Sequence, residues 1–155
     1  MNSKRLLIVV AVLAAAIFVG GLTWSDWSSE ASERVKVVMY QNPACGCCSK
    51  WAQHMERNGF EVEIHKSPEL NRIKEREGIT RKTAACHTSF VGGYVVEGHV
   101  PARDIKRLLR EKPQVHGLTV PGMPAGSPGM EGPRRDRYDV LTFDKEGNTT
   151  VYSSY

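Results

Sequence analysis

The alternation of apolar and polar positions from residue 35 onward predicts short strands and amphipathic helices that follow one another along the chain. Gly59 and Gly78 end the first two helical patterns, and Ser67-Pro68-Glu69 is a strong helix start. Gly92-Gly93 is a two-residue turn between two apolar runs, which is typical of a hairpin. The predicted elements are strand 35–40, helix 49–58, strand 60–65, helix 67–78, hairpin 90–97 and a helix that opens at 101–104.

The C-terminal part of the chain has two different patterns. Residues 117–133 contain five glycines, four prolines and two methionines among 17 residues, which predicts neither helix nor central strand. Apolar runs at 140–143 and 149–152 then flank a polar turn and predict a terminal hairpin. The order βαβα, then ββα and a C-terminal hairpin, predicts an α/β domain of thioredoxin-like layout over residues 35–155.

The N-terminus has the pattern of an export signal. Lys4 and Arg5 precede an unbroken apolar run over residues 6–22, and positive charge before such a run stays in the cytoplasm. The run has 17 residues, the lower limit for crossing a bilayer, and no clean small-x-small cleavage site follows it. We interpret 1–24 as a signal peptide or a membrane anchor and 25–34 as a polar tether. The following domain is expected in the periplasm, either released or held at the inner membrane.

Composition limits the classes of partner. The chain has 155 residues, of which 41% are hydrophobic and 25% are charged, as in an ordinary globular domain with its own core. A formal net charge of +4 is too small to indicate nucleic-acid binding.

The chemistry of the chain is concentrated in four cysteines. Cys45, Cys47 and Cys48 follow the first predicted strand, and Cys86 comes 38 residues after Cys48. Thiolates are both soft metal ligands and redox nucleophiles. Cys45 and Cys48 have the C-x-x-C spacing of thioredoxin-like oxidoreductases, from which the additional Cys47 departs. One structural disulfide plus a spare thiol is a further alternative.

A second segment adds candidate ligands. Cys86-His87 precedes the predicted hairpin, where a thioredoxin-like fold normally has a cis-proline that docks substrate. No proline is present here, which weakens the disulfide-reductase interpretation and adds a fourth sulfur. His87 is a candidate through its position beside Cys86, whereas His99 is either a ligand or a polar loop residue. The remaining histidines are expected to face solvent: His54, His65 and His116.

Two methionines repeat in a Pro-Gly-Met pattern. Met123 and Met130 lie in a segment with few other hydrophobic residues, so burial explains them poorly. Thioether sulfur selects Cu(I), and we favour ligation or a lid role over loop packing. Zinc is the rival metal, but structural zinc sites usually place their cysteines on two separate knuckles. Three thiols crowded on one knuckle favour Cu(I), with thiolates shared between more than one ion as an open option.

Taken together, the motifs resemble the CopG-like copper-resistance proteins, small exported bacterial proteins long labelled a domain of unknown function. The resemblance runs from about residue 35 to 155 and rests on Cys45-Gly46-Cys47-Cys48, Cys86-His87-Thr88, Gly98-His99-Val100-Pro101 and the segment 117–131. It implies a thioredoxin-like fold, a periplasmic setting and copper binding in copper tolerance. Carried over by position, the ligands would be the four cysteines, with Met123 and Met130 as thioether contributors.

Three functional hypotheses follow. The first is a periplasmic protein that holds Cu(I) and changes its oxidation state or passes it to other periplasmic copper-handling proteins or a redox partner; whether it is a copper oxidoreductase is open. The second is a thiol–disulfide oxidoreductase that uses Cys45 and Cys48. The third is a structural zinc domain without catalysis.

Overall fold

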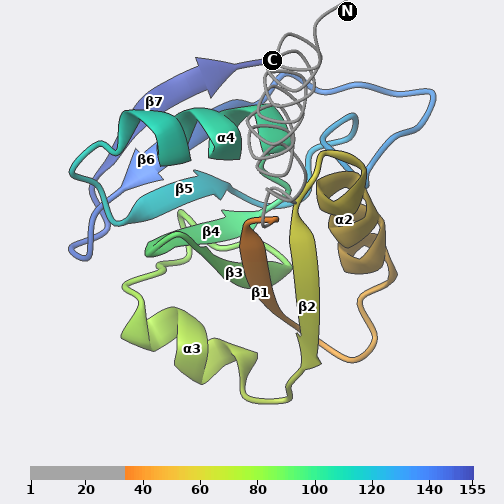
Figure 1. Ribbon diagram of the computed structural model, residues 1–155, viewed down its shortest axis with the longest axis horizontal. Helices are drawn as coiled ribbons and strands as arrows, with labels where there is room; N and C mark the ends of the chain where they lie inside the picture. The colour runs from red at the N-terminus through yellow and green to blue at the C-terminus, as the bar shows by residue number, and fades with distance from the viewer. Residues whose placement is uncertain (1–33) are drawn as a thin grey trace, which may run out of the picture. The chain divides into compact units, whose positions relative to one another are not determined.

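The computed structural model describes residues 34–155, which form one compact unit (Figure 1). The predicted signal or anchor and most of the predicted tether therefore lie outside the described residues. Within residues 34–155, no helix is both long and apolar enough to cross a membrane.

The domain is a mixed α/β structure built on one seven-stranded sheet in the order β2-β1-β3-β4-β5-β6-β7. Two neighbouring pairs, β1 with β2 and β4 with β5, are parallel, and the other four pairs are antiparallel. The elements in chain order are β1 (Lys36–Gln41), α2 (Gly46–Arg57), β2 (Glu61–Lys66), α3 (Leu70–Arg76), β3 (His87–Val91), β4 (Tyr94–Gly98), α4 (Ala102–Glu111), β5 (Gly117–Val120), β6 (Asp139–Phe143) and β7 (Thr149–Ser154).

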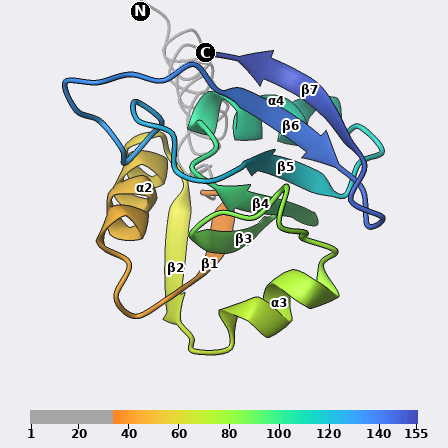
Figure 2. The same ribbon diagram turned by 180° about the vertical axis from the view of Figure 1, so that it is seen from behind.

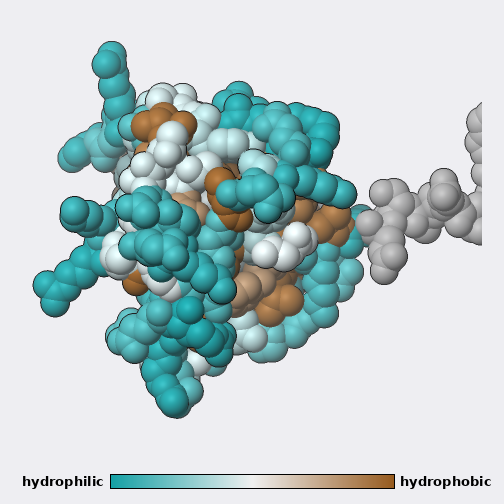
Figure 3. Space-filling model, turned by 90° about the vertical axis from the view of Figure 1, so that its left-hand side faces the viewer, coloured by the Kyte–Doolittle hydropathy of each residue, from teal (hydrophilic) through white to brown (hydrophobic). Residues whose placement is uncertain are grey.

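The helices divide between the two faces of the sheet. Successive side chains of a strand point to opposite faces, so Val95 and Val96 of β4 mark different sides. Val96 belongs to the main core with residues of α2 and α4, such as Trp51 and Ile105. Val95 belongs to a smaller cluster on the other face, and Figures 1 and 2 show α3 well apart from α2 and α4. The view in Figure 3 is largely hydrophilic with small separate apolar areas.

The predicted strands and helices are present in the predicted order, including the hairpin that turns at Gly92 and Gly93, where φ is +54° and +86°, but the strand β5 was not predicted. The prediction for residues 117–133 was wrong at its start, because β5 lies between β4 and β6 inside the sheet. Its proline-free residues 117–120 can donate ladder hydrogen bonds. A Cβ at Gly117 would lie 1.9 Å from the Val95 carbonyl oxygen, so glycine permits the close pairing with β4.

Candidate metal centre

The first three cysteines lie at the N-terminal end of α2. Cys45 is the N-cap residue in an extended conformation, with φ −83° and ψ 95°, and Cys47 and Cys48 occupy the first helical turn. The preceding turn is closed by hydrogen bonds from Cys45 N to Asn42 O (3.0 Å) and from Ala44 N to Asn42 Oδ1 (3.0 Å). The helix was predicted to start at residue 49. It starts three residues earlier, so the cysteines lie at the helix N-terminus, where backbone N–H groups are left unpaired.

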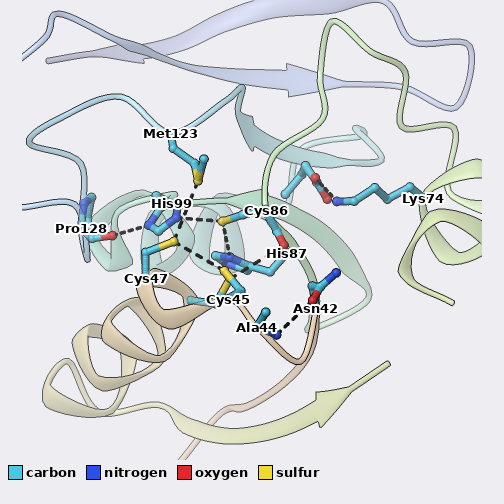
Figure 4. The surroundings of a disulfide bond; sticks show 12 residues. Asn42, Ala44, Cys45, Cys47, Lys74, Cys86, His87, His99, Met123 and Pro128 are labelled. Carbon is cyan, nitrogen blue, oxygen red and sulfur yellow. Dashed lines mark hydrogen bonds and ion pairs between the residues drawn. A yellow bond between two sulfur atoms is a disulfide. The ribbon is translucent and has the colours of Figure 1, made fainter. Parts of the chain in front are cut away.

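Two of these cysteines are already joined. A disulfide connects Cys45 and Cys48, and Cys48 is fully buried. Cys47 and Cys86 are free thiols, and Cys47 Sγ lies 3.5 Å from Cys45 Sγ (Figure 4). The C-x-x-C pair is therefore oxidised in this structure, and the four cysteines become four thiols only after that bond is reduced.

Cys86 completes the sulfur cluster. Its turn faces the start of α2, and the four sulfur atoms lie within 4.8 Å of one another. Burial, followed by the neighbouring Cys47, raises the pKa of the Cys86 thiol to about 12. Cys86 is therefore a protonated thiol near neutral pH, and a cation that binds it must displace the proton.

Two imidazoles flank Cys86. His99 Nε2 lies 2.9 Å and His87 Nδ1 lies 3.3 Å from Cys86 Sγ, so these three side chains form a second potential ligand set. His87 is fully buried against the ring of Trp51, and its Nε2 atom has no hydrogen-bond partner among residues 34–155. Burial, reinforced by the neighbouring His99, holds the pKa of His87 well below its usual range. Burial also lowers the pKa of His99, so both rings are neutral, the form that binds metals.

The two loop methionines have different positions. Met123 Sδ lies 3.9 Å from Cys47 Sγ, and Met123 is 52% exposed, so its thioether lies at the open side of the cluster. Met130 shapes the loop through its backbone: its N–H donates to Ser127 O (2.8 Å), and its carbonyl accepts from Gly126 N (2.9 Å). The structure thus brings Met123 to the sulfur cluster and gives Met130 a turn-forming contact.

The loop that carries these methionines is attached at both ends to the site. Gly122 N donates to Ala84 O (2.9 Å), in the turn that carries Cys86. Farther along, the carbonyl oxygen of Pro128 lies 2.7 Å from His99 Nδ1. Gly129 packs on the first two turns of α2, since a Cβ there would lie 2.8 Å from Trp51 N and 3.1 Å from Cys47 O. Hydrogen bonds therefore connect the loop that carries Met123 and Met130 to the Cys86 turn and to His99.

Two of the histidines that were expected to face solvent are instead partly buried. His54 Nε2 accepts a hydrogen bond from Ala102 N (3.1 Å) at the start of α4, and His116 lies 3.3 Å from Glu77 Oε2 with a side chain only 16% exposed. A pattern of single polar residues did not show these contacts, because they join segments far apart in sequence. The side chain of His65 is 42% exposed, more than that of His116.

Sequence reasoning also missed a buried ion pair behind the Cys86 turn, between Lys74 of α3 and Glu97 of β4. One signal was available. Glu97 stands beside Val95 and Val96 in a predicted strand whose neighbours are apolar, so a charge there is anomalous. Lys74, on a polar helix face, gives no such signal.

The chain is similar to known proteins over most of its length. A family model described as "Protein of unknown function, DUF411" matches residues 83–130, which include Cys86, His99 and both loop methionines. Two solved structures named "Copper resistance protein copG", Form 2 and Form 1, are each 42% identical to this chain and cover 79% of it. The chain covers 99% and 98% of them, with TM-scores of 0.75 and 0.74. A search of the curated proteins finds no match. The chain therefore belongs to the CopG copper-resistance family, which includes the DUF411 segment.

Proposed function

We propose that this protein binds copper in copper resistance, and that it holds Cu(I) through the thiolates of its four cysteines. The observation that carries the proposal is the convergence of four sulfur atoms within 4.8 Å of one another, with the Met123 thioether 3.9 Å from Cys47 Sγ. Soft sulfur ligands select Cu(I) over harder cations. The ligands proposed are Cys45, Cys47, Cys48 and Cys86, with Met123, His87 and His99 as additional donors and Met130 as a loop residue.

The donor set supports copper more than zinc. A structural zinc site is closed by four tetrahedral ligands, usually from two separate knuckles. Here Cys47 and Cys48 are adjacent in one helical turn, and a thioether and two neutral imidazoles lie beside the thiols. More donors are present than one tetrahedral ion needs, so we propose shared thiolates and more than one Cu(I).

Redox chemistry enters through the disulfide. Reduction of the Cys45–Cys48 bond takes two electrons and two protons and yields two thiols, so full copper loading requires a reductant. In the opposite direction, oxidation of two thiolates to a disulfide releases two electrons, enough to reduce two Cu(II) ions to Cu(I). We propose this exchange as the route by which the protein would change the oxidation state of copper before passing it on.

We further propose a thioredoxin-like core and a periplasmic location. The first proposal is supported by the β2-β1-β3-β4 order, by parallel β1 and β2, and by a C-x-x-C pair at the start of the helix after β1. The second rests on the apolar run at residues 6–22 and on the likeness to copper-resistance proteins. Retention at the inner membrane would follow from an uncleaved run.

A second candidate function is thiol–disulfide exchange through Cys45 and Cys48, which the disulfide at the helix N-terminus favours. The position of Cys47 argues against it. Its sulfur lies 3.5 Å from Cys45 Sγ, so an internal thiol competes with any substrate thiol for the same disulfide.

Anaerobic titration tests the two functions together. The reduced protein and its Cys47→Ser variant are titrated with Cu(I) in competition with a strong Cu(I) chelator. Weak binding by the parent, or binding unchanged in the variant, overturns the copper proposal. The exchange function instead requires turnover of a disulfide substrate that survives both Cys47→Ser and Cys86→Ser. A zinc domain would contain tightly held zinc that copper does not displace.

A further inference from the structure

Three buried polar side chains form a row across the centre of the sheet, on the face that carries α3. Thr88 of β3 pairs with Glu97 of β4, and Glu97 pairs with Thr119 of β5. All three residues are 0% exposed. Burying polar groups this deeply costs free energy unless each has a hydrogen-bond partner. The partners of these three side chains therefore indicate what the row does.

The partners lie in the turn that carries Cys86. The Glu97 carboxylate accepts hydrogen bonds from Ala85 N (2.6 Å) and from Thr88 Oγ1 (2.6 Å). Thr119 Oγ1 donates to the carbonyl oxygen of Thr83 (2.6 Å). The row therefore holds two residues just before Cys86, and its own member Thr88 lies two residues after Cys86.

Lys74 supplies the countercharge. Its ammonium group pairs with Glu97 Oε1 and donates to Thr88 Oγ1 (3.1 Å). A buried ion pair is weak evidence for stability, because well-packed apolar residues of the same volume are often equally stable. Its presence behind a ligand turn therefore points to a task other than stability.

The turn needs this support because it lies outside the strands. Ala85 N precedes β3 and accordingly finds its acceptor in a side chain. Gly98, with φ +73°, lets the turn sit against the end of β4, since a Cβ there would lie 2.4 Å from the Ala85 Cβ. The Glu97 carboxylate and the missing side chain at residue 98 thus set where Ala85, and with it Cys86, can lie.

We propose that Glu97, neutralised by Lys74, is a positioning residue of the copper site, which fixes the Ala85–Cys86 turn so that the Cys86 sulfur faces Cys47 and His99. This inference rests on the proposed copper function for its consequence, and on the hydrogen bonds of Glu97 for its geometry. Glu97 touches no proposed ligand atom. It acts through Ala85 N–H, as outer partners of metal ligands do.

Two double variants separate positioning from charge and from stability. Glu97→Gln with Lys74→Met keeps a carbonyl oxygen for Ala85 N–H, whereas Glu97→Leu with Lys74→Met removes it. Neither leaves an unpaired buried charge, so both are expected to fold. Asp104→Asn is the control for an unrelated buried carboxylate. Asp104 is 2% exposed and accepts from Ser153 Oγ and Tyr155 Oη, away from the turn.

The first readout is metal-free. In the protein with its disulfide intact, Cys86 and Cys47 are the free thiols, and their alkylation by iodoacetamide is followed by peptide mapping. In the variant with Glu97→Leu and Lys74→Met (the Leu/Met variant), we expect iodoacetamide to alkylate Cys86 about fivefold faster relative to Cys47. The lost hydrogen bond should raise the open population of the turn by about that factor. The variant with Glu97→Gln and Lys74→Met is called the Gln/Met variant. The Gln/Met variant and Asp104→Asn keep the parental ratio.

The second readout is Cu(I) affinity of the reduced proteins by chelator competition. The Leu/Met variant loses about tenfold, the usual effect of removing an outer partner of a metal ligand. The Gln/Met variant stays within about threefold of the parent. Parental alkylation ratio and affinity in the Leu/Met variant overturn the proposal, as does an equal loss in the Gln/Met variant. A parent that binds no Cu(I) defeats the proposed function instead, and the alkylation ratio then still decides the positioning role.

Discussion

His99 Nε2 lies 2.9 Å from the sulfur of Cys86, while the other ring nitrogen, Nδ1, lies 2.7 Å from the carbonyl oxygen of Pro128. A carbonyl only accepts hydrogen bonds, so Nδ1 carries the proton and Nε2 presents its lone pair to Cys86. Burial lowers the pKa of His99 and keeps the ring neutral. The methionine loop thus orients a ready imidazole donor beside a thiol.

The first prediction concerns this imidazole. We expect His99→Ala to weaken Cu(I) binding by about tenfold, or about 1.4 kcal/mol, because a donor and its orienting contact are lost together. His65→Ala is the matched control, since His65 lies on β2, has a side chain that is 42% exposed, and stacks on Tyr40. Chelator competition measures both variants. Equal Cu(I) affinities for the parent, His99→Ala and His65→Ala would show that His99 does not take part in Cu(I) binding.

The second prediction separates the two methionines. Met123→Leu should weaken Cu(I) retention by about tenfold, because it removes a soft donor that lies 3.9 Å from Cys47 Sγ. Met130→Leu should keep parental retention, because its contacts in the turn are made by the backbone. The rate of copper transfer to a chelator measures retention. A larger loss of copper retention in Met130→Leu than in Met123→Leu would contradict the proposal that Met123 is the donor and Met130 a loop residue.

Much of the fold was predictable because the local signals agree with the tertiary structure. Strict alternation at 60–65 predicted β2 to within one residue, and Gly92-Gly93 fixed the β3–β4 hairpin. The strand β5 was missed because a window rich in glycine and proline was read as a whole. The first four residues of this window contain no proline. Glycine at residue 117 is favourable because it permits the close approach of β4 at Val95, which the local sequence does not show.

That the four cysteines come together was predictable, but which of them form a disulfide and which residues hold the Cys86 turn were not. The expected thioredoxin-like layout placed Cys86 near Cys45, Cys47 and Cys48, and the structure brings the four sulfur atoms within 4.8 Å of one another. Which pair is oxidised depends on side-chain directions in the first turn of α2, which spacing does not determine. The Lys74–Glu97 pair is non-local, because 23 residues separate its members, and no local pattern links them.

The third prediction concerns loop docking. Gly129→Ala should destabilise the protein by about 2–3 kcal/mol, because φ is +86° and the new Cβ would lie 2.8 Å from Trp51 N and 3.1 Å from Cys47 O. Gly122→Ala is the control for backbone strain alone, with φ +70° and, apart from its chain neighbours, no atom of the described residues within 4 Å of its Cβ, and should cost about 1 kcal/mol. Urea unfolding measures both. Equal losses would show that contact with α2 adds nothing.

The fourth prediction concerns acid. Burial, followed by the nearby Arg57, lowers the pKa of His54 below its usual 6.5, and His54 Nε2 accepts from Ala102 N–H. Because the unfolded chain takes up the proton more readily, this contribution to stability is present above pH 6.5 and is lost as the pH falls through the lower folded-state pKa. His87 and His99 act with the same sign.

The test compares His54→Gln with the parent. The free energy of unfolding is measured in urea at about pH 7.5 and about pH 5, on either side of the ordinary histidine pKa. We expect the parent to lose more stability on acidification than the variant, whose amide oxygen still accepts from Ala102 N–H at both values. Identical losses would show that folding leaves the pKa of His54 unchanged.

The fifth prediction concerns the disulfide between Cys45 and Cys48, which leaves Cys47 and Cys86 as the free thiols of the described domain. Two thiolates hold fewer Cu(I) ions than four, so copper content should rise when the protein is reduced, freed of reductant and loaded anaerobically. Copper per protein after desalting measures the capacity. In the Cys45→Ser/Cys48→Ser variant, which has no such bond to open, prior reduction should not change the copper content. Equal content in the oxidised and reduced parent would mean that Cys45 and Cys48 bind no copper, and the cluster would then reduce to Cys47, Cys86 and their neighbouring donors.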